Sequence, residues 1–390
     1  MSSFFAIGDW GYYDNWRVKI NTLTGERSTP EHDWRVEWRL TNGACQGLLA
    51  DRMRAVAEAR QYTDAPFKFV VNVGDNFYPA GVWGTADPVW KTEWGDVYHG
   101  LPDMPWYSVY GNHDYGQYNR PCGCTGEQDV KGEDCAQVQK HGAVLNGQTW
   151  YMPEMSYYVQ PLPGVNLEIV TVDLNILDSH KACPWIVCGQ KKCSADGSDA
   201  KEIRIRKDRG KQTEHTTTTM CTMPVCTNTM QTRALAAYEL LKQRIAAAKA
   251  VTPRRHLIIN SHYPTTFLKW WKHPTEHKTF NDLLNDPALH ITFFGGHVHA
   301  TDNVTNVNKD MRRHGWKDYC VGGGGGWACD NAFTWASQGF VTGVVMSDGS
   351  ITDLQFEMQP DDKCCVMNDH TEETPRPPPS PKPPENDLAV

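Results

Sequence analysis

Five short polar motifs carry side chains that commonly bind metal ions, and each motif follows an apolar run. The motifs are Asp9-Trp10-Gly11, Gly74-Asp75-Asn76-Phe77-Tyr78, Gly111-Asn112-His113-Asp114, Asn260-Ser261-His262 and Gly296-His297-Val298-His299. Oxygen and imidazole ligands of these kinds suit iron, zinc or manganese better than calcium. Two carboxylates, three histidines, one asparagine and one tyrosine make seven such side chains, which are too many for one ion. They suit two ions if one carboxylate bridges them, and two-metal sites clamp the attacking and leaving oxygens of a phosphoryl transfer.

Each motif taken singly has an ordinary structural explanation. An aspartate after a strand is often a turn or a helix cap, and a lone histidine such as His262 is often a hydrogen-bonded core residue. His297 and His299 are more suggestive, because a spacing of two places both rings on one face of a strand. The five motifs together, each at the end of an apolar run, favour one shared site.

Apolar runs alternate with amphipathic stretches along the chain, which predicts a layered α/β domain. Strands are expected at 3–8, 67–73, 106–110, 167–173, 255–261, 290–295, 340–346 and 351–357. Helices are expected at 44–62, 230–249 and 278–285. The last two strands are joined by Ser347-Asp348-Gly349, which predicts an antiparallel hairpin. Because functional groups gather beyond the carboxyl ends of strands in open α/β sheets, these elements would bring the five motifs together.

The composition excludes several classes of function. The 390 residues carry a net charge of −8, which argues against general binding of nucleic acid or of anionic membranes. No apolar run reaches the length of about 18 residues that a membrane span needs. Neither end resembles a signal peptide. The apolar run at 2–10 begins almost at Met1, as expected if a leader has been replaced by a start methionine.

The chain contains 13 cysteines, which is many for a cytosolic enzyme. Most of them lie in polar segments that would form little core, so disulfide bonds and an oxidising compartment are the natural interpretation. Reduced structural thiols are the alternative. A zinc site is a weaker alternative, because no CxxC pair occurs. The sequon at Asn303-Val304-Thr305 is consistent with a secreted glycoprotein.

The expected domain organisation is one catalytic domain with a tail. Residues 1–360 would form the domain, and the polar, cysteine-rich segment 178–229 would be a long surface insertion within it. Residues 361–390 are proline-rich and would form an extended tail, with an unknown partner if it has one.

The motifs DxG, GDxxY, GNHD, xxxH and GHxH, in this order, resemble those of the purple acid phosphatases, which are binuclear members of the calcineurin-like metallophosphoesterases. The resemblance covers residues 4 to about 346 and is closest to the small, single-domain, tartrate-resistant type. It implies a four-layer α/β/β/α sandwich of two mixed sheets flanked by helices. It also implies an acid phosphatase that hydrolyses phosphate monoesters.

The resemblance assigns a role to each motif. It implies that Asp9, Tyr78 and His299 bind Fe(III), and that Asp75 bridges the two ions. It implies that the second ion, a divalent iron, zinc or manganese, is bound by Asn112, His262 and His297. His113 would contact the phosphate together with Asn112 and protonate the leaving group, while a metal-bound hydroxide attacks phosphorus.

Gly11 departs from the DxH motif with which many metallophosphoesterases begin, where the histidine binds the first metal. Glycine has no side chain to bind, and Tyr78 is the expected replacement. Its phenolate is a hard anionic oxygen that favours Fe(III) over Fe(II). Two nearby cations would lower the phenol pKa.

Other functions remain open at the level of sequence. The same fold can serve as a membrane-associated anchoring protein with secondary phosphatase activity, although a complete ligand set favours the enzyme. A nucleotide or phosphodiester hydrolase with the same metals is a further alternative. The leading prediction is a secreted phosphatase acting on a phosphorylated small molecule or protein. The cysteine-rich loops at 116–150 and 178–229 and the aromatic residues Trp10, Trp83, Trp270 and Trp271 are candidate walls of the site, although packing is the more ordinary role of those aromatic residues.

Overall fold

The computed structural model describes residues 1–11, 19–20, 27–28, 42–78, 81–82, 84–115, 122–180, 185–188, 223–302, 317–326 and 338–359. The tail at 361–390, the sequon at 303–305 and Trp83 lie outside these residues, as does most of the segment 178–229. Within the described residues no helix is long and apolar enough to cross a bilayer.

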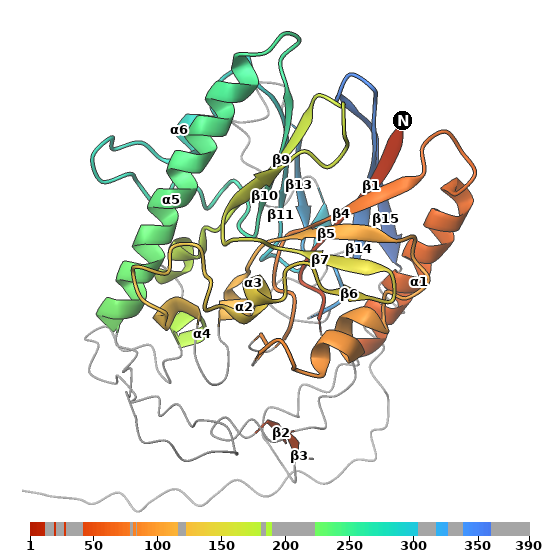
Figure 1. Cartoon of the computed structure of the whole chain (residues 1–390), viewed down its shortest axis with the longest axis horizontal. Helices are drawn as coiled ribbons and strands as arrows, with labels where there is room; N and C mark the ends of the chain where they lie inside the picture. Colours follow the sequence, from red (N-terminus) through yellow and green to blue (C-terminus); the bar gives the residue numbers. More distant parts are fainter. Residues whose placement is uncertain are drawn as a thin grey trace, which may run out of the picture.

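Two mixed β-sheets form the centre of the molecule (Figure 1). The first has the strand order β15 (Ile351–Gln359), β14 (Gln338–Val345), β1 (Ser2–Ile7), β4 (Phe67–Asn72), β5 (Met104–Ser108), β7 (Gln148–Tyr151) and β6 (Val144–Leu145). The second has the order β12 (Thr301–Asp302), β13 (Lys317–Val321), β11 (His290–Gly295), β10 (His256–Ser261), β9 (Leu167–Val172) and β8 (Tyr157–Val159). Their central strands are parallel, and antiparallel strands complete both sheets. The lone pair β2 (Lys19–Ile20) and β3 (Arg27–Ser28) forms a third, two-stranded sheet.

Helices cover the outer sides of the two central sheets, which gives the predicted four layers. Helix α1 (Asn42–Arg60) contacts β14 and β15, whereas α5 (Met223–Lys249) contacts β9 (Figure 1). The short helix α6 (Phe280–Leu284) packs against α5. The remaining helices are η2 (Trp90–Gly95), α2 (Asn112–Tyr115), η3 (Cys122–Cys124), α3 (Ala136–Gln139), η4 (Asn175–His180) and α4 (Trp185–Cys188).

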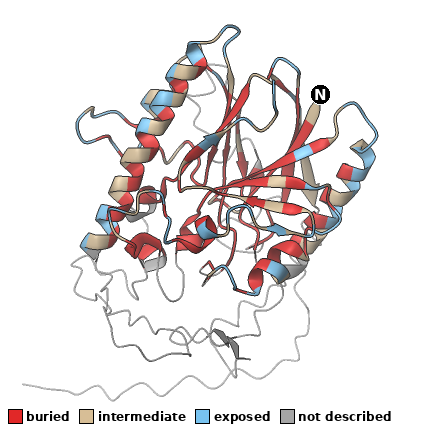
Figure 2. Ribbon diagram, viewed as in Figure 1, coloured by how far each residue is buried: buried red, intermediate tan, exposed pale blue. Residues whose placement is uncertain are grey.

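The core lies between and on both sides of the sheets (Figure 2). All six residues of β9 and all eight of β14 are buried. Strands covered on both faces contain continuous apolar runs, which is why they are recognisable in the sequence. Phe4 of the first sheet and Phe294 of the second meet edge to face, with ring centroids 5.9 Å apart.

The boundaries of several expected elements need correction. The strand expected at 106–110 is Met104–Ser108, because the chain leaves the sheet at Val109. The helix expected at 230–249 begins at Met223, so the residues from there to Thr229 belong to a packed helix. The predicted hairpin is confirmed, since β14 and β15 pair antiparallel.

Disulfide bonds are present, as the cysteine distribution predicts. Cys122 pairs with Cys135, and Cys188 pairs with Cys226 across 38 residues of sequence. Cys45 and Cys124 each take part in a disulfide bond as well.

Candidate metal centre

The five motifs meet where the two sheets face each other. Asp9 follows β1, Asp75 and Tyr78 follow β4, and Asn112 follows β5 of the first sheet. His262 follows β10 of the second sheet, and His297 and His299 follow β11. The structure therefore brings together all seven side chains expected as ligands, at the carboxyl ends of parallel strands.

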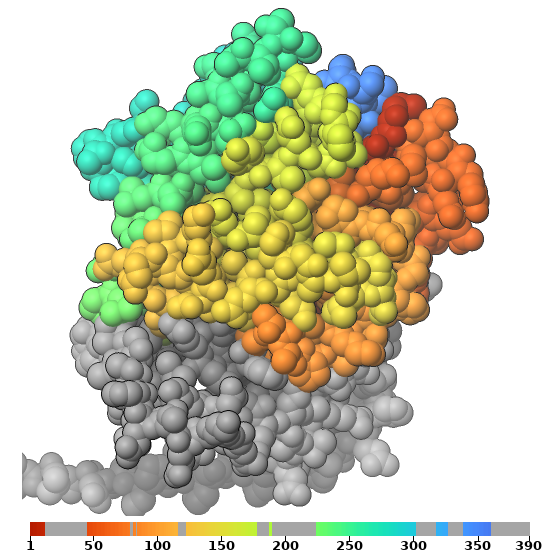
Figure 3. All heavy atoms as spheres, viewed as in Figure 1, coloured from red at the N-terminus to blue at the C-terminus, as the bar shows by residue number. Residues whose placement is uncertain are grey.

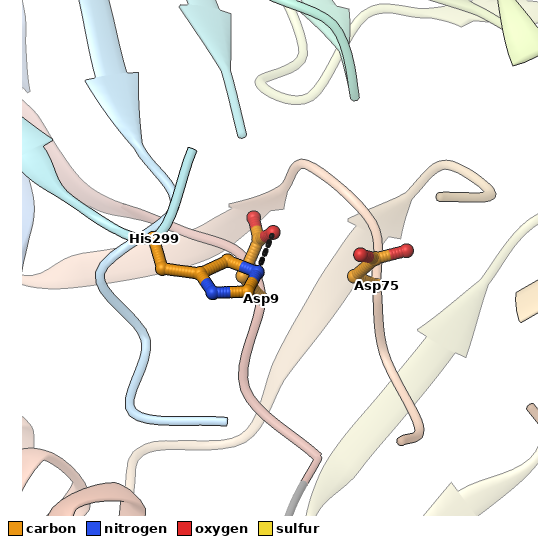
Figure 4. Close-up of side chains that lie close together, drawn as sticks. All are labelled: Asp9, Asp75 and His299. Carbon is orange, nitrogen blue, oxygen red and sulfur yellow. Dashed lines mark ion pairs between the residues drawn. The ribbon is translucent and has the colours of Figure 1, made fainter. Parts of the chain in front are cut away.

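The first group of side chains surrounds the hydroxyl of Tyr78. Its oxygen lies 3.3 Å from Asp9 Oδ1 and 3.2 Å from His299 Nε2. His299 Nε2 lies 3.7 Å from the same oxygen of Asp9. Asp9, Asp75 and His299 offer ligand atoms that all lie within 4.8 Å of one another (Figure 4).

The second group surrounds the amide oxygen of Asn112. His262 Nε2 lies 2.9 Å from this oxygen, and His297 Nδ1 lies 3.0 Å from it. Asn112 and His262 are buried. The group thus offers one oxygen and two imidazole nitrogens within a small volume.

Asp75 lies between the two groups. Its Oδ2 atom is 3.0 Å from Tyr78 Oη in the first group and 3.5 Å from His262 Nε2 in the second. Its Oδ1 atom accepts a hydrogen bond of 2.9 Å from the His113 amide. One carboxylate oxygen therefore faces both groups, as a bridging ligand must.

The contacts of His262 are compatible with a cation in the second group. Its Nδ1 lies 3.0 Å from the Val73 carbonyl oxygen, which can only accept, so Nδ1 carries the proton. Burial lowers the pKa of His262 and favours the neutral ring. Its Nε2 then directs a lone pair at the Asn112 oxygen, which is also an acceptor. A bound cation turns this contact between two acceptors into favourable coordination, so the donor set fits a metal ion.

The ionisation of the buried acidic groups is also compatible with a bound cation. Burial and the nearby Asp75 charge raise the pKa of Asp9 well above its usual value. Burial and the same carboxylates raise the pKa of the Tyr78 hydroxyl. Burial also opposes ionisation of Asp75, but the neighbouring imidazoles of His262, His113 and His297, together with the hydrogen bond from the His113 amide, lower its pKa. Like charges held close together in a buried site need positive charge to offset them.

The backbone at the centre is strained. Asp9, Asp75 and His297 have positive φ angles of 55°, 49° and 67°. Such conformations are uncommon for residues other than glycine and cluster at functional sites. Neighbouring glycines make room for the carboxylates, since a Cβ at Gly111 would lie 2.1 Å from Asp75 Oδ1 and one at Gly296 would lie 2.3 Å from Asp9 Oδ2.

Gly11 cannot be replaced by any residue with a side chain in this backbone. A Cβ at this position would lie 1.8 Å from the Asn76 carbonyl oxygen. The Tyr78 amide donates to the Gly11 carbonyl at 3.0 Å, which holds the two segments together. The close approach that excludes a histidine at Gly11 thus also places Tyr78 beside Asp9.

Two residues of the motifs have supporting roles that the sequence alone does not assign. Asp114 is fully buried, and its carboxylate accepts hydrogen bonds from the amides of Asn76, Phe77 and Gly111. The Asn76 side chain donates to Asp114 Oδ2 at 2.9 Å. Asp114 thereby joins the loop that carries Asp75 to the loop that carries Asn112. Both residues stand inside the quoted motifs, but they are 38 positions apart and their pairing could not be inferred from spacing.

The remaining expected residues lie close to the centre or in the core. The His113 ring lies 4.6 Å from the Tyr78 ring, between centroids, and His113 is 7% exposed. Trp10 is fully buried and donates to Asn72, and Trp271 is buried too, so both pack in the core. Trp270 is half-buried and stacks obliquely on Phe267, which in turn contacts His297.

The chain resembles known phosphoesterases. The family model described as calcineurin-like phosphoesterase matches residues 2–301. Purple acid phosphatase 7 of Arabidopsis thaliana is 39% identical over 80 residues, or 20% of this chain and 23% of the relative. Tartrate-resistant acid phosphatase type 5 of Oryctolagus cuniculus is 28% identical over 114 residues, or 29% of this chain and 26% of the relative. The matched segments thus span about a quarter of these relatives.

A solved structure of a 5'-nucleotidase precursor from Thermus thermophilus aligns with a TM-score of 0.33 and 11% identity. The alignment covers 92% of this chain and 54% of that one. A score this low carries no argument about function.

Proposed function

The chain belongs to the calcineurin-like phosphoesterase family, and on this premise we propose that it is a phosphatase that hydrolyses phosphate monoesters at two metal ions. The observation that carries the proposal is the position of Asp75. One of its oxygens lies 3.0 Å from Tyr78 Oη and 3.5 Å from His262 Nε2, between two groups of ligand-type atoms. A carboxylate so placed can bridge two ions.

The proposed ligand sets follow these two groups. Asp9, Tyr78 and His299 would hold Fe(III), because a phenolate oxygen favours the trivalent ion. Asn112, His262 and His297 would hold a divalent iron, zinc or manganese ion. When bound, the two ions would offset the charge of the phosphate oxygens and activate a water molecule for in-line attack.

The protein's own groups would orient the substrate and move one proton. Asp75 is held by the His113 amide at 2.9 Å, so the bridging carboxylate and the His113 backbone form one unit. The His113 imidazole, beside the Tyr78 ring, is the proposed donor of a proton to the leaving alkoxide. Asn112 and His113 together would contact the phosphate.

The disulfide bonds support a location in the secretory pathway or outside the cell. Cys122–Cys135 and Cys188–Cys226 are both formed. Disulfides persist in oxidising compartments and are rare in the cytosol. We therefore propose that the protein is secreted. Its proposed substrate is a phosphorylated small molecule or protein.

Metal analysis of the purified full chain combined with a phosphatase assay tests the proposal. The expected result is two metal ions per chain, one of them iron, and turnover of a phosphomonoester at mildly acidic pH. A phosphodiester and a nucleoside triphosphate should be poorer substrates. Preference for either of these would point to a different hydrolase, and a metal-free, inactive chain would favour a scaffold.

His262→Ala is the sharpest single variant. We expect it to lower phosphomonoester turnover at least about a hundredfold, because it removes a ligand outright. His256→Ala is the matched control, since it removes another histidine of the same strand, β10, at the end away from the centre. The control should keep its activity. Equal activity of His262→Ala and the wild type would rule out the two-metal site.

A further inference from the structure

Arg233 is a buried charge outside the metal centre. It lies on α5 and is 2% exposed. Its guanidinium donates to Thr125 Oγ1 at 3.0 Å, to the Cys122 carbonyl at 3.2 Å and to Asp129 Oδ2 at 3.2 Å. It also lies 3.3 Å from Cys122 Sγ and 3.5 Å from Cys135 Sγ. Burying a guanidinium carries a large desolvation cost, so these contacts call for a reason beyond stability.

The same guanidinium reaches the last residue of α2. It donates to Tyr115 Oη at 3.1 Å, and the Tyr115 hydroxyl in turn donates to Asp173 Oδ2. Asp173 lies just beyond β9, and its other oxygen accepts from the Asn175 amide at 3.0 Å. Tyr115 is therefore held between a helix on one side and a strand end on the other.

A second connection runs from the same loop to α2. The Cys122–Cys135 disulfide closes a loop that leads directly into α3. The Gln137 side chain of α3 donates to Asp114 Oδ1 at 2.7 Å and accepts from the Asn76 side-chain amide at 3.0 Å. In Figure 3 the loop, in golden yellow, lies directly against the green α5. Arg233 thus stabilises a loop that leads into α3, whose Gln137 contacts α2 at Asp114. Arg233 also contacts α2 itself at Tyr115.

We propose that Arg233 and the disulfide-closed loop 122–135 form a clamp that positions α2. Helix α2 has four residues and begins with Asn112 and His113. A helix this short has no stability of its own, so tertiary contacts must fix its place. Arg233 is in this sense a positioning residue for the reaction proposed above, and the inference rests on that proposed function only for its effect on turnover.

Hydrogen exchange of α2 tests the clamp without reference to activity. The His113 amide is a useful probe, because it donates to Asp75 Oδ1 and should exchange slowly. In Arg233→Met, which keeps the bulk but not the donors, we expect exchange in 112–115 to quicken at least about tenfold. Tyr115→Phe, which removes only the shared hydroxyl, should act in the same direction. Exchange in β10 should stay as in the wild type.

Arg244→Met is the matched control. Arg244 lies on the same helix and forms a comparable ion pair, with 2.6 Å and 2.8 Å contacts to Glu168, away from α2. This variant should leave exchange in 112–115 unchanged. If Arg233→Met unfolds the chain, hydrogen exchange of residues 112–115 in Tyr115→Phe tests the clamp instead. Wild-type exchange of α2 in a folded Arg233→Met or Tyr115→Phe overturns the clamp.

Turnover gives a second readout. A misplaced α2 should lower kcat for a phosphomonoester by about tenfold to a hundredfold and leave KM nearly unchanged. Arg233→Lys keeps the charge but not the planar guanidinium group with its paired donors. Its kcat should therefore lie between those of Arg233→Met and the wild type. A raised KM with unchanged kcat would contradict positioning. An inactive wild type would refute the proposed function, and the exchange experiment would still decide the clamp.

Discussion

At the scale of single residues, the centre favours function over stability. Three of the expected ligands, Asp9, Asp75 and His297, adopt positive φ angles, and the two carboxylates are buried next to each other. Each feature costs free energy of folding in the absence of metal. The fold therefore holds these groups together against an unfavourable conformation and mutual repulsion. Variants of single ligands should reveal this cost.

Tyr78→Phe should remove the proposed phenolate ligand while keeping the ring. We expect the visible absorption of an iron-loaded protein to disappear and iron content to fall, because the Fe(III)-binding oxygen is lost. Absorption spectra and metal analysis of the purified variant measure both effects. Phe77→Leu is the control, since Phe77 packs against Trp10 and Trp90 in the core. An unchanged spectrum in Tyr78→Phe would remove this tyrosine from the ligand set.

Asp9→Asn should stabilise the metal-free chain and weaken metal binding. Burial and Asp75 raise the pKa of Asp9 in the folded state, so its ionised form destabilises the fold at neutral pH. Asparagine removes the charge and tolerates the positive φ angle. We expect the free energy of unfolding to increase, measured with urea in the presence of a chelator. A loss of stability in the chelated variant would show that Asp9 is not a strained charge.

At the scale of elements, loop-to-loop hydrogen bonds fix the centre more than the strands do. Asp114 accepts from three backbone amides in two loops, and Gln137 of α3 adds a contact of 2.7 Å. The strands deliver each loop to the same edge of the sheets, but these bonds set the distances between the ligands. Asp114 is thus the point through which the two ligand-bearing loops of the first sheet are joined.

Asp114→Asn should loosen both loops. The amide keeps one acceptor oxygen but places an NH₂ group against backbone N–H donors, so buried donors lose their partners. We expect a loss of about 2–3 kcal/mol in the free energy of unfolding and weaker binding of a divalent metal such as zinc. Urea denaturation and calorimetric titration measure the two effects. Gln139→Glu, a change at an exposed position of α3, is the control. It should change neither the free energy of unfolding nor the affinity for zinc.

The sequence predicts the central strands and the β14–β15 hairpin, but it misses the other outer strands. β1, β4, β9, β10 and β11 are largely buried and appear as continuous apolar runs. β7 and β13 contain polar residues and are missed, because their place depends on neighbouring strands rather than on their own composition. The expected ligands could be named from residue type and order. The roles of Asp114 and Arg233 could not, because they depend on partners distant in sequence.

At the scale of the whole molecule, the candidate centre joins the two sheets. Four expected ligands follow strands of the first sheet, and three follow strands of the second. Beneath them, Asn260 of β10 donates to the Tyr107 carbonyl of β5 at 2.9 Å. Metal binding would therefore stabilise the packing of one sheet on the other, since an ion bound only by the folded state shifts the equilibrium towards it.

At the opposite end of the second sheet, His256 should make the stability of the fold sensitive to acid. Burial and the charges of His290 and Lys317 lower the pKa of His256 to about 4. The unfolded chain, with a pKa near about 6.5 at this residue, binds a proton that the folded chain does not. Stability should therefore fall as the pH drops from about 6.5 to about 4.

His256→Gln isolates this contribution. The glutamine can keep a hydrogen bond to Thr292, which His256 Nε2 contacts at 3.0 Å, but it does not titrate. We expect the wild type to lose about 2 kcal/mol more than the variant between pH 7 and pH 4. Urea denaturation of both metal-free proteins at several pH values measures the difference. Parallel pH profiles would show that the half-buried ring of His256 contributes nothing to the acid sensitivity.

The tight contact at Gly11 also bears on how such centres diverge. A Cβ at this position would lie 2.5 Å from the Asn76 carbonyl carbon and 2.7 Å from Phe77 Cα, so the loop must move before a histidine can be placed there. Moving that loop displaces Tyr78, the residue expected to replace the histidine. A chain with the glycine–tyrosine arrangement thus cannot reach the histidine arrangement by one viable point mutation. The two ligand arrangements therefore require different courses of the loop that carries Tyr78.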